Sequence, residues 1–304
     1  MSITAPVPGG IVVDAAADEV DAVRSEAEVQ RRRAKGRRLL VNAVAVALIV
    51  VTVFPVYWMV TTSFRRGIDI RSDPQFLPFG GTLANYRTVF ERDFFWTAFR
   101  NSILVTLLTV ALALFLAFLA ALAISRFRFR GRVAFLVMIL VVQMVPTEAL
   151  MISLVKVLDG WHLRNSIAGL TIAYVAFVLP FTVWTLRGFI VNIPRELEEA
   201  AMVDGCSRTT AFIRVVFPLL APGMVATSVY GFIQAWNEYL YALMLMSQQN
   251  QTATVWLGNF TTKHGTEYAP MMAGSTMMAV PIVVLFLLVQ RKMAAGLTAG
   301  AVKG

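Results

Sequence analysis

Long apolar stretches separated by short polar segments set the pattern of this chain from residue 39 onward. Six of these stretches run for about twenty residues or more, and at a rise of about 1.5 Å per residue a helix of that length crosses a hydrocarbon core of about 30 Å. The pattern therefore predicts six transmembrane helices, at Leu40–Thr62, Phe99–Ile124, Val133–Val157, Ile167–Ile190, Gly223–Met246 and Ala269–Val289.

The predicted spans are helical because a backbone that faces lipid must satisfy its hydrogen bonds within its own segment. Prolines interrupt four of the spans, at Pro55, Pro146, Pro180 and Pro281. These prolines are either packing features or bends in a wall around a pathway, since neighbouring helices or water can satisfy the freed carbonyl groups. The expected fold class is an all-α membrane protein, with its six-helix domain at residues 39–304.

The amino-acid composition also indicates a membrane protein. Of the 304 residues, 58% are hydrophobic and 15% are charged, whereas about a quarter are charged in a typical soluble domain. One cysteine and two histidines offer neither an internal disulfide nor metal-ligand spacing, so no cofactor is expected. The net charge of +9 is concentrated beside the apolar stretches, which indicates membrane topology and not a nucleic acid partner.

The distribution of positive charge predicts the orientation in the membrane. Residues 1–38 are polar and end in a basic cluster, so we expect a disordered cytoplasmic tail and not a cleavable signal peptide. With the N-terminus inside, the cytoplasmic segments hold 18 Lys and Arg residues and the outer segments hold 9. The positive-inside rule then places both termini in the cytoplasm.

A cytoplasmic segment of about 30 residues, 191–222, separates the fourth and fifth predicted spans. Pro194 suits a first helical position, and the glutamates that follow suit the positive end of a helix dipole. Gly205 can end this helix in the left-handed conformation, Ser207 can cap a second helix, and Pro218 can terminate it. We expect a helix–turn–helix on the inner face, whose small alanines suit a groove on another protein.

The spacing of this segment resembles the cytoplasmic loop of binding-protein-dependent ABC importer permeases. In that family a Glu-Ala-Ala run is followed after three residues by Gly and further on by Pro, and Cys206 stands where the family often has alanine. The resemblance implies that the loop is a coupling helix that docks into a cleft of an ATPase subunit. The residues expected to couple are Glu199, Ala200, Ala201, Asp204, Gly205, Phe212 and Pro218.

The run Trp236-Asn237-Glu238-Tyr239 lies inside the fifth predicted span. It resembles the corresponding segment of permeases from the carbohydrate branch of this family, and within that branch the shorter membrane subunit of maltose-type importers. Glu238 is costly in lipid, so it should face the bundle interior or a cavity, where flanking aromatic rings suit a sugar. The alternative is a hydrogen-bonded pair that joins two helices, and both interpretations also apply to Gln143 and Glu148 near Pro146. The candidates for a translocation path are Trp236, Asn237, Glu238, Tyr239 and Gln143.

The C-terminal segment, residues 291–304, is similar to the tail of the same permease subtype, which reaches toward the ATPase dimer interface. Its small residues and terminal positive charge suit a flexible strand that enters a cleft, although disorder is the default for such a composition. The residues implied are Gly296, Leu297, Gly300 and Lys303. The whole resemblance extends from about Ala43 to Gly304.

The resemblance implies a permease subunit of an ABC importer in the bacterial inner membrane, which is not itself an enzyme. The sequence contains no Gly-x-x-x-x-Gly-Lys-Ser/Thr run, so ATP hydrolysis is expected on a partner ATPase dimer. The other implied partners are a second homologous permease and an extracellular solute-binding protein that delivers a sugar or oligosaccharide. The outer segment 64–98 is a candidate docking surface, with Phe94, Phe95 and Trp96 as apolar anchors.

Two alternatives stand beside sugar import by an ABC transporter. The first is glycerol-phosphate or polyol cargo, which similar permeases handle. The second is an ion-driven secondary transporter, which requires intramembrane carboxylates or inverted repeats. Glu148 and Glu238 are the candidate carboxylates, and the two halves of the chain show no evident repeat.

Overall fold

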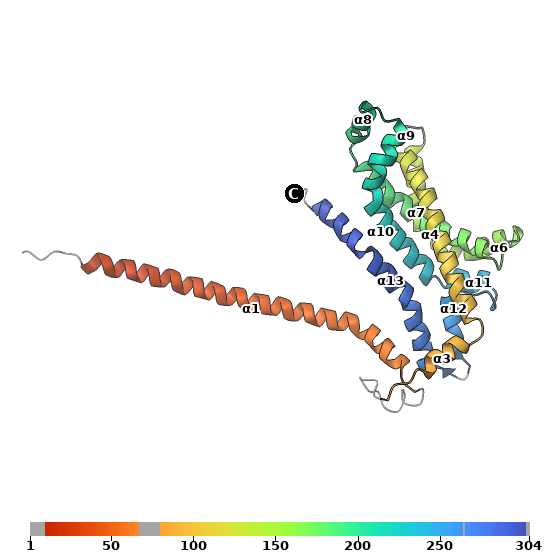
Figure 1. Ribbon diagram of the computed structural model, residues 1–304, viewed down its shortest axis with the longest axis horizontal. Coiled ribbons are helices and arrows are strands. Elements are labelled where there is room, and N and C mark those ends of the chain that lie inside the picture. The colour runs from red at the N-terminus through yellow and green to blue at the C-terminus, as the bar shows by residue number, and fades with distance from the viewer. Residues whose placement is uncertain (1–9, 67–79, 264, 302–304) are drawn as a thin grey trace, which may run out of the picture. The chain divides into compact units, whose positions relative to one another are not determined.

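Helices make up almost all of the part of the chain that the computed structural model describes, residues 10–66, 80–263 and 265–301 (Figure 1). The chain divides into two units, residues 1–58 and 59–304. The helices are α1 (Gly10–Ser63), α3 (Ala84–Glu91), α4 (Phe95–Arg126), α5 (Arg132–Met144), α6 (Thr147–Gly160), α7 (Ile167–Val191), α8 (Arg195–Val203), α9 (Arg208–Ala211), the π-helical η1 (Phe212–Val216), α10 (Phe217–Asn237), α11 (Leu240–Leu245), α12 (Ala253–Leu257), the 3-10 turn η2 (Gly258–Phe260) and α13 (Tyr268–Ala301). Strands β1 (Thr261–Thr262) and β2 (Gly265–Thr266) pair antiparallel.

Five helical stretches of the described chain are long and apolar enough to cross a membrane. They are Lys35–Ser63, Phe95–Arg126, Ile167–Val191, Arg208–Asn237 and Tyr268–Gln290. Four of these match the predicted first, second, fourth and sixth spans to within a few residues. The predicted helical class is therefore confirmed, with five or six helical segments as candidate membrane spans.

The predicted third span is not one straight helix. Helices α5 and α6 together are long and apolar enough to span, but they meet at an angle of 104°. Val145, the residue before Pro146, has an extended ψ of 124°, because the proline ring disfavours helical backbone at the preceding position. Pro146 thus breaks the helix, and the count is six spans only if this bent pair counts as one.

The predicted fifth span is displaced toward the N-terminus. A continuous helical rod runs from Arg208 to Asn237, and the chain becomes extended at Glu238 with a ψ of 133°. The prediction that Pro218 ends a helix is wrong. The backbone N–H of Phe217 bonds the carbonyl of Phe212, five residues back, and this wider π turn accommodates a proline at the next position, which has no N–H of its own.

The ends of the chain also differ from expectation. Helix α1 begins at Gly10, although the sequence suggested disorder up to residue 38. No Gly or Pro stands between residues 11 and 35, and the Ala, Glu and Arg residues there favour helix. At the other end α13 continues to Ala301, so the backbone of residues 291–301 is helical where a flexible strand was expected. Lys303 lies outside the described residues.

Close packing of α4, α7 and α10 forms the centre of the second unit (Figure 1). Ala113, Ala117 and Ala121 recur every four residues on α4 and are almost fully buried. Such small residues let helix backbones approach closely in a membrane. On α10, a Cβ at Gly223 would lie 2.5 Å from Cγ of Phe189 on α7, so only glycine fits at that crossing.

Candidate functional site

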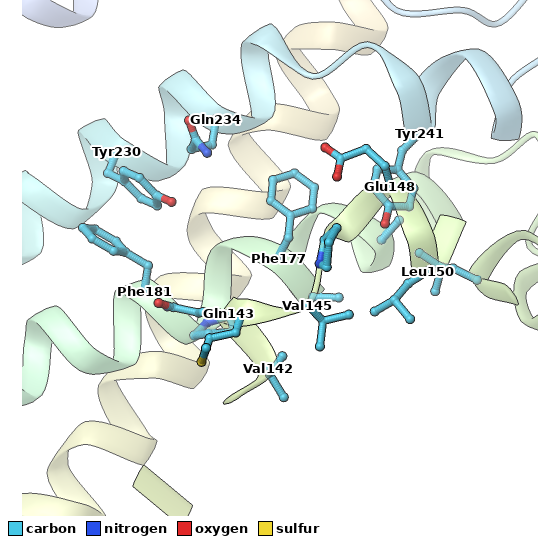
Figure 2. A pocket seen from close by; sticks show the side chains of 16 residues that line it. Val142, Gln143, Val145, Glu148, Leu150, Phe177, Phe181, Tyr230, Gln234 and Tyr241 are labelled. Carbon is cyan, nitrogen blue, oxygen red and sulfur yellow. The ribbon is translucent and has the colours of Figure 1, made fainter. Parts of the chain in front are cut away.

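A cavity of about 520 Å³ lies where the break between α5 and α6 faces α7 and α10 (Figure 2). Two of the prolines predicted to interrupt spans line it, namely Pro146 at the break between α5 and α6, and Pro180 inside the continuous helix α7. The lining residues are Val142, Gln143, Met144, Val145, Pro146, Glu148, Leu150, Leu154, Ala173, Ala176, Phe177, Pro180, Phe181, Tyr230, Gln234 and Tyr241.

Two pairs of aromatic rings line this cavity. Phe181 and Tyr230 face each other with ring centroids 3.9 Å apart. Phe177 and Tyr241 lie almost parallel, at 6.1 Å and an interplanar angle of 18°. The side chains of Gln143, Glu148 and Gln234 line the same cavity (Figure 2). Flat apolar faces beside amide and carboxylate groups suit the binding of a sugar ring.

A second hollow of about 310 Å³ adjoins the cavity. It shares Glu148, Phe177, Gln234 and Tyr241 with the larger one, so the two form a continuous surface. The residues that the smaller hollow adds are Asn237, Glu238, Tyr239 and Leu240. Four of the five path candidates predicted from sequence therefore line this combined surface, namely Gln143, Asn237, Glu238 and Tyr239.

Glu238 has a structural role in addition to lining the hollow. Its Oε1 accepts a hydrogen bond from the backbone N–H of Tyr241 at 2.8 Å, and its Oε2 accepts one from Ala242 at 3.1 Å. Its carbonyl accepts a hydrogen bond from the Thr254 hydroxyl at 2.8 Å. The carboxylate thus satisfies N–H groups that the start of α11 would leave without partners, and this capping explains why the helical rod stops at Asn237.

Trp236, the fifth candidate, lines neither of these two hollows. Its side chain is 3% exposed, its Nε1 donates to the carbonyl of Met278 at 3.1 Å, and its ring stacks on Phe232. Trp236 therefore joins α10 to α13. Asn237 lines the smaller hollow, but its amide also donates to the carbonyl of Ile233 in its own helix at 3.0 Å.

Sequence reasoning missed five of the side chains with the most suitable chemistry. They are Tyr230, Gln234 and Tyr241 on α10 and α11, and Phe177 and Phe181 on α7. A signal was available for α10, because residues 230, 234 and 237 follow the three- and four-residue spacing of one helix face. The aromatic pair on α7 carries the same four-residue spacing.

The helix–turn–helix predicted after the fourth span is present as α8, a tight turn and α9. Gly205 has φ of +91°, the N–H of Gly205 bonds Met202 O at 3.1 Å, and that of Cys206 bonds Ala201 O at 3.0 Å. These are the two bonds of a Schellman motif, which requires the left-handed conformation that glycine adopts without penalty. Ser207 Oγ accepts the N–H of Thr210 at 3.2 Å and caps α9, as predicted.

An ion pair fixes this hairpin, residues 195–211, to the end of α4. Glu198 lies 3.6 Å from Nε of Arg126, and both side chains are about nine-tenths buried. Arg126 also donates to Ile193 O, and Arg195 donates to Ser125 O, each at 3.3 Å. Sequence reasoning did not single out Glu198, because burial on a short amphipathic helix depends on what packs beneath it.

Most of the other residues of α8 are exposed. Glu199 and Ala200 are exposed, as are the apolar residues Leu197, Met202 and Val203, with Val203 at 87% exposure. Of the other residues expected to couple, Asp204 and Gly205 are exposed at the turn, Ala201 is half-buried, and Phe212 packs on Phe118 with ring centroids 5.8 Å apart. The hairpin thus presents apolar surface beside negative charge.

The remaining predictions concern the two ends of the second unit. Phe95 is 1% exposed and packs against Trp256, so it cannot anchor a docking protein. Phe94 and Trp96 are exposed, and Trp96 stacks on Phe90. In the C-terminal segment, the backbone at Gly296, Leu297 and Gly300 belongs to α13.

The chain matches one family model and is similar in sequence to several known proteins. A family model described as "Binding-protein-dependent transport system inner membrane component" matches residues 113–294. The chain is 44% identical over 269 residues to the diacetylchitobiose uptake system permease protein DasC of Streptomyces coelicolor, covering 88% of this chain and 98% of that protein. It is 36% identical over 253 residues to the trehalose transport system permease protein SugB of Mycobacterium tuberculosis, covering 82% and 92% of the two chains.

A solved structure has the same fold. It is a bacterial ABC transporter involved in the import of the acidic polysaccharide alginate, and one of its chains matches with a TM-score of 0.72 at 23% identity. The match covers 83% of this chain and 95% of that chain. The arrangement of helices described above is therefore one that a transporter subunit adopts.

Proposed function

This chain belongs to the family of binding-protein-dependent transport system inner membrane components, and from that premise we propose that it is a permease subunit of an ATP-driven importer of sugars or oligosaccharides. The observation that carries the proposal is the cavity at the α5–α6 break, which is lined by two aromatic pairs together with amide and carboxylate side chains. Relatives named for diacetylchitobiose and trehalose transport support a carbohydrate as the cargo.

The charge of the cavity favours an uncharged sugar over a phosphorylated one. Glu148 stands in the first turn of α6 and Glu238 just before α11, and both carboxyl groups belong to the lining of the smaller hollow. No Lys or Arg lines either hollow in the part of the chain that the structure describes. A phosphate group would meet two like charges here, so glycerol-phosphate is the less favoured cargo.

A second, homologous permease would complete the path. Val142, Val145 and Leu150 line the cavity and are also exposed, and exposed apolar side chains around a hollow mark a surface for another protein. The cargo would enter between the two subunits from an extracellular binding protein. With both termini in the cytoplasm, as the charge distribution predicts, the hairpin lies on the side of an ATPase dimer.

The proposed mechanism involves no bond chemistry in this chain. ATP binding and hydrolysis occur on the partner, and closure of the ATPase dimer moves the docked hairpin. The exposed Leu197, Met202 and Val203 supply apolar contact for docking, while the Arg126–Glu198 ion pair carries the motion to α4. The rod from Arg208 to Asn237 carries it to the cavity.

A pull-down followed by an ATPase assay tests this proposal. Tagged wild-type chain, extracted in mild detergent, is expected to co-purify with an ATP-binding subunit and a second permease. A valine at Gly205 is strained because φ is positive, so G205V is expected to lose the ATP-binding subunit. The matched control is G265V, since Gly265 also has a positive φ and open space around it.

Transport in liposomes separates the proposal from its rival. The complex is expected to import sugar only when ATP, the ATP-binding subunit and the binding protein are present. Import by the chain alone, driven by a proton or sodium gradient, would refute the proposal and establish a secondary transporter.

A further inference from the structure

Arginine and phenylalanine alternate in the loop between α4 and α5, a feature that the proposed transport function does not use. The run is Arg126-Phe127-Arg128-Phe129-Arg130-Gly131-Arg132. Helix α4 ends at Arg126, α5 begins at Arg132, and both belong to candidate membrane spans. Only five residues connect the two helices, so the loop must lie at the membrane surface.

Three of the four arginines have no acidic partner among the residues that the structure describes. Arg126 is paired with the buried Glu198. For Arg128, Arg130 and Arg132, no carboxylate of the described chain lies within ion-pair distance. Unpaired guanidinium groups at this spacing create a local positive field that attracts an anion.

The loop also encloses a hollow with two kinds of surface. Its volume is about 530 Å³, and its lining residues are Arg128, Phe129, Gly131, Arg132, Val133 and Ala134. Two arginines thus line the hollow together with apolar residues, of which Phe129 is 46% exposed and Val133 is 72% exposed. A ligand that fits must carry an anion on one side and a hydrocarbon on the other.

We propose that this loop binds the headgroup phosphate of an anionic phospholipid. The planar guanidinium fork of Arg128 and Arg132 suits phosphate oxygens, Arg130 adds to the positive field, and Phe129 and Val133 contact the first part of the acyl chain. Basic pockets between transmembrane helices are a known setting for anionic headgroups. A soluble anion or an acidic protein surface would leave the apolar side chains exposed, so a lipid fits the surface better.

The bound lipid would stabilise the membrane end of the hairpin. Phe127 of the same loop lies under the guanidinium of Arg208, at 5.6 Å from ring centroid to Cζ, and Arg126 holds Glu198. Lipid bound at Arg128 and Arg132 would therefore hold the loop in place, and with it the Phe127–Arg208 contact and the Arg126–Glu198 ion pair.

The test compares two triple variants in the complex that co-purifies with the tagged full-length chain. One variant replaces the loop arginines (R128Q, R130Q, R132Q), and the control removes the same charge from exposed positions elsewhere (R100Q, K156Q, R164Q). Each preparation is incubated with short-chain phosphatidylglycerol, short-chain phosphatidylcholine or inorganic phosphate. The measured quantities are bound lipid by native mass spectrometry and the shift in melting temperature.

We expect phosphatidylglycerol alone to bind and to raise the melting temperature of wild type and control. Affinity should fall about fivefold for each loop arginine removed. An equal response to phosphatidylcholine or to inorganic phosphate would overturn the proposal, as would unchanged phosphatidylglycerol binding by the loop variant. Normal lipid binding combined with loss of the ATP-binding subunit would also overturn it and assign the loop to a protein partner. None of these outcomes depends on transport, so failure here leaves the proposed function separately testable.

Discussion

Removing the charge of Glu198 should loosen the hairpin 195–211 without unfolding the membrane helices. In E198Q the guanidinium of Arg126, about nine-tenths buried, loses its only anionic partner among the described residues. Breaking a buried pair from one side costs about 3–5 kcal/mol when the pair is fully hydrogen-bonded. Here Nε of Arg126 lies 3.6 Å from the carboxylate and makes no hydrogen bond, so we expect a cost below that range, about 2 kcal/mol.

A loss of about 2 kcal/mol corresponds to a roughly 30-fold rise in the open population of the hairpin. Hydrogen–deuterium exchange on the detergent-purified complex measures this directly, and amides of residues 200–206 should lose protection by that factor while those of α4 and α7 do not. The matched control is E196Q, which removes an exposed carboxylate from the same helix. Equal protection in E198Q and E196Q would refute the reasoning, because the ion pair would then contribute nothing to holding the hairpin.

Two further substitutions test the packing of α10. Replacing Gly223 by leucine drives a side chain into the ring of Phe189, so G223L should lower the melting temperature by several degrees in a detergent thermal-shift assay. G188L, where a Cβ meets nothing within 4 Å, should leave it unchanged, and equal melting of the two would contradict the close approach. Replacing Trp236 by phenylalanine removes the hydrogen bond to Met278, which should cost about 1 kcal/mol, or roughly 2–4 °C, and leave the KM for transport unaltered. A raised KM with normal melting would return Trp236 to the translocation path.

Hydropathy predicted most of the fold, because the length of an apolar stretch is a local property. The spans near α1, α4, α7 and α13 were placed to within a few residues on that basis. The turn of the hairpin could be predicted for the same reason. Gly205 acts through its own backbone conformation, and Ser207 caps the N–H of a residue three positions further on.

The parts that sequence could not predict depend on partners distant in the chain. Trp236 faces α13 and not the cavity because of a carbonyl 42 residues away. Glu198 is buried because Arg126 lies beneath it. The end of the helix at Glu238 could not be predicted from the periodicity of apolar residues. It arises because the Glu238 carboxylate accepts hydrogen bonds from N–H groups at the start of the next helix, and this arrangement competes with continuation of α10.

The π turn at Phe212–Val216 divides the rod from Arg208 to Asn237 into two very unequal arms. On one side stands the four-residue α9, and on the other the 21 residues of α10, which at about 1.5 Å per residue extend for roughly 32 Å. If the rod pivots at this turn, a rotation of about 10° displaces its far end by about 5 Å, close to the pitch of one helical turn. The near end, only about 6 Å from the pivot, moves by about 1 Å. Such a pivot would convert a movement of about a bond length at the hairpin into a change of several ångströms in the position of the α10 end that lies beside the cavity.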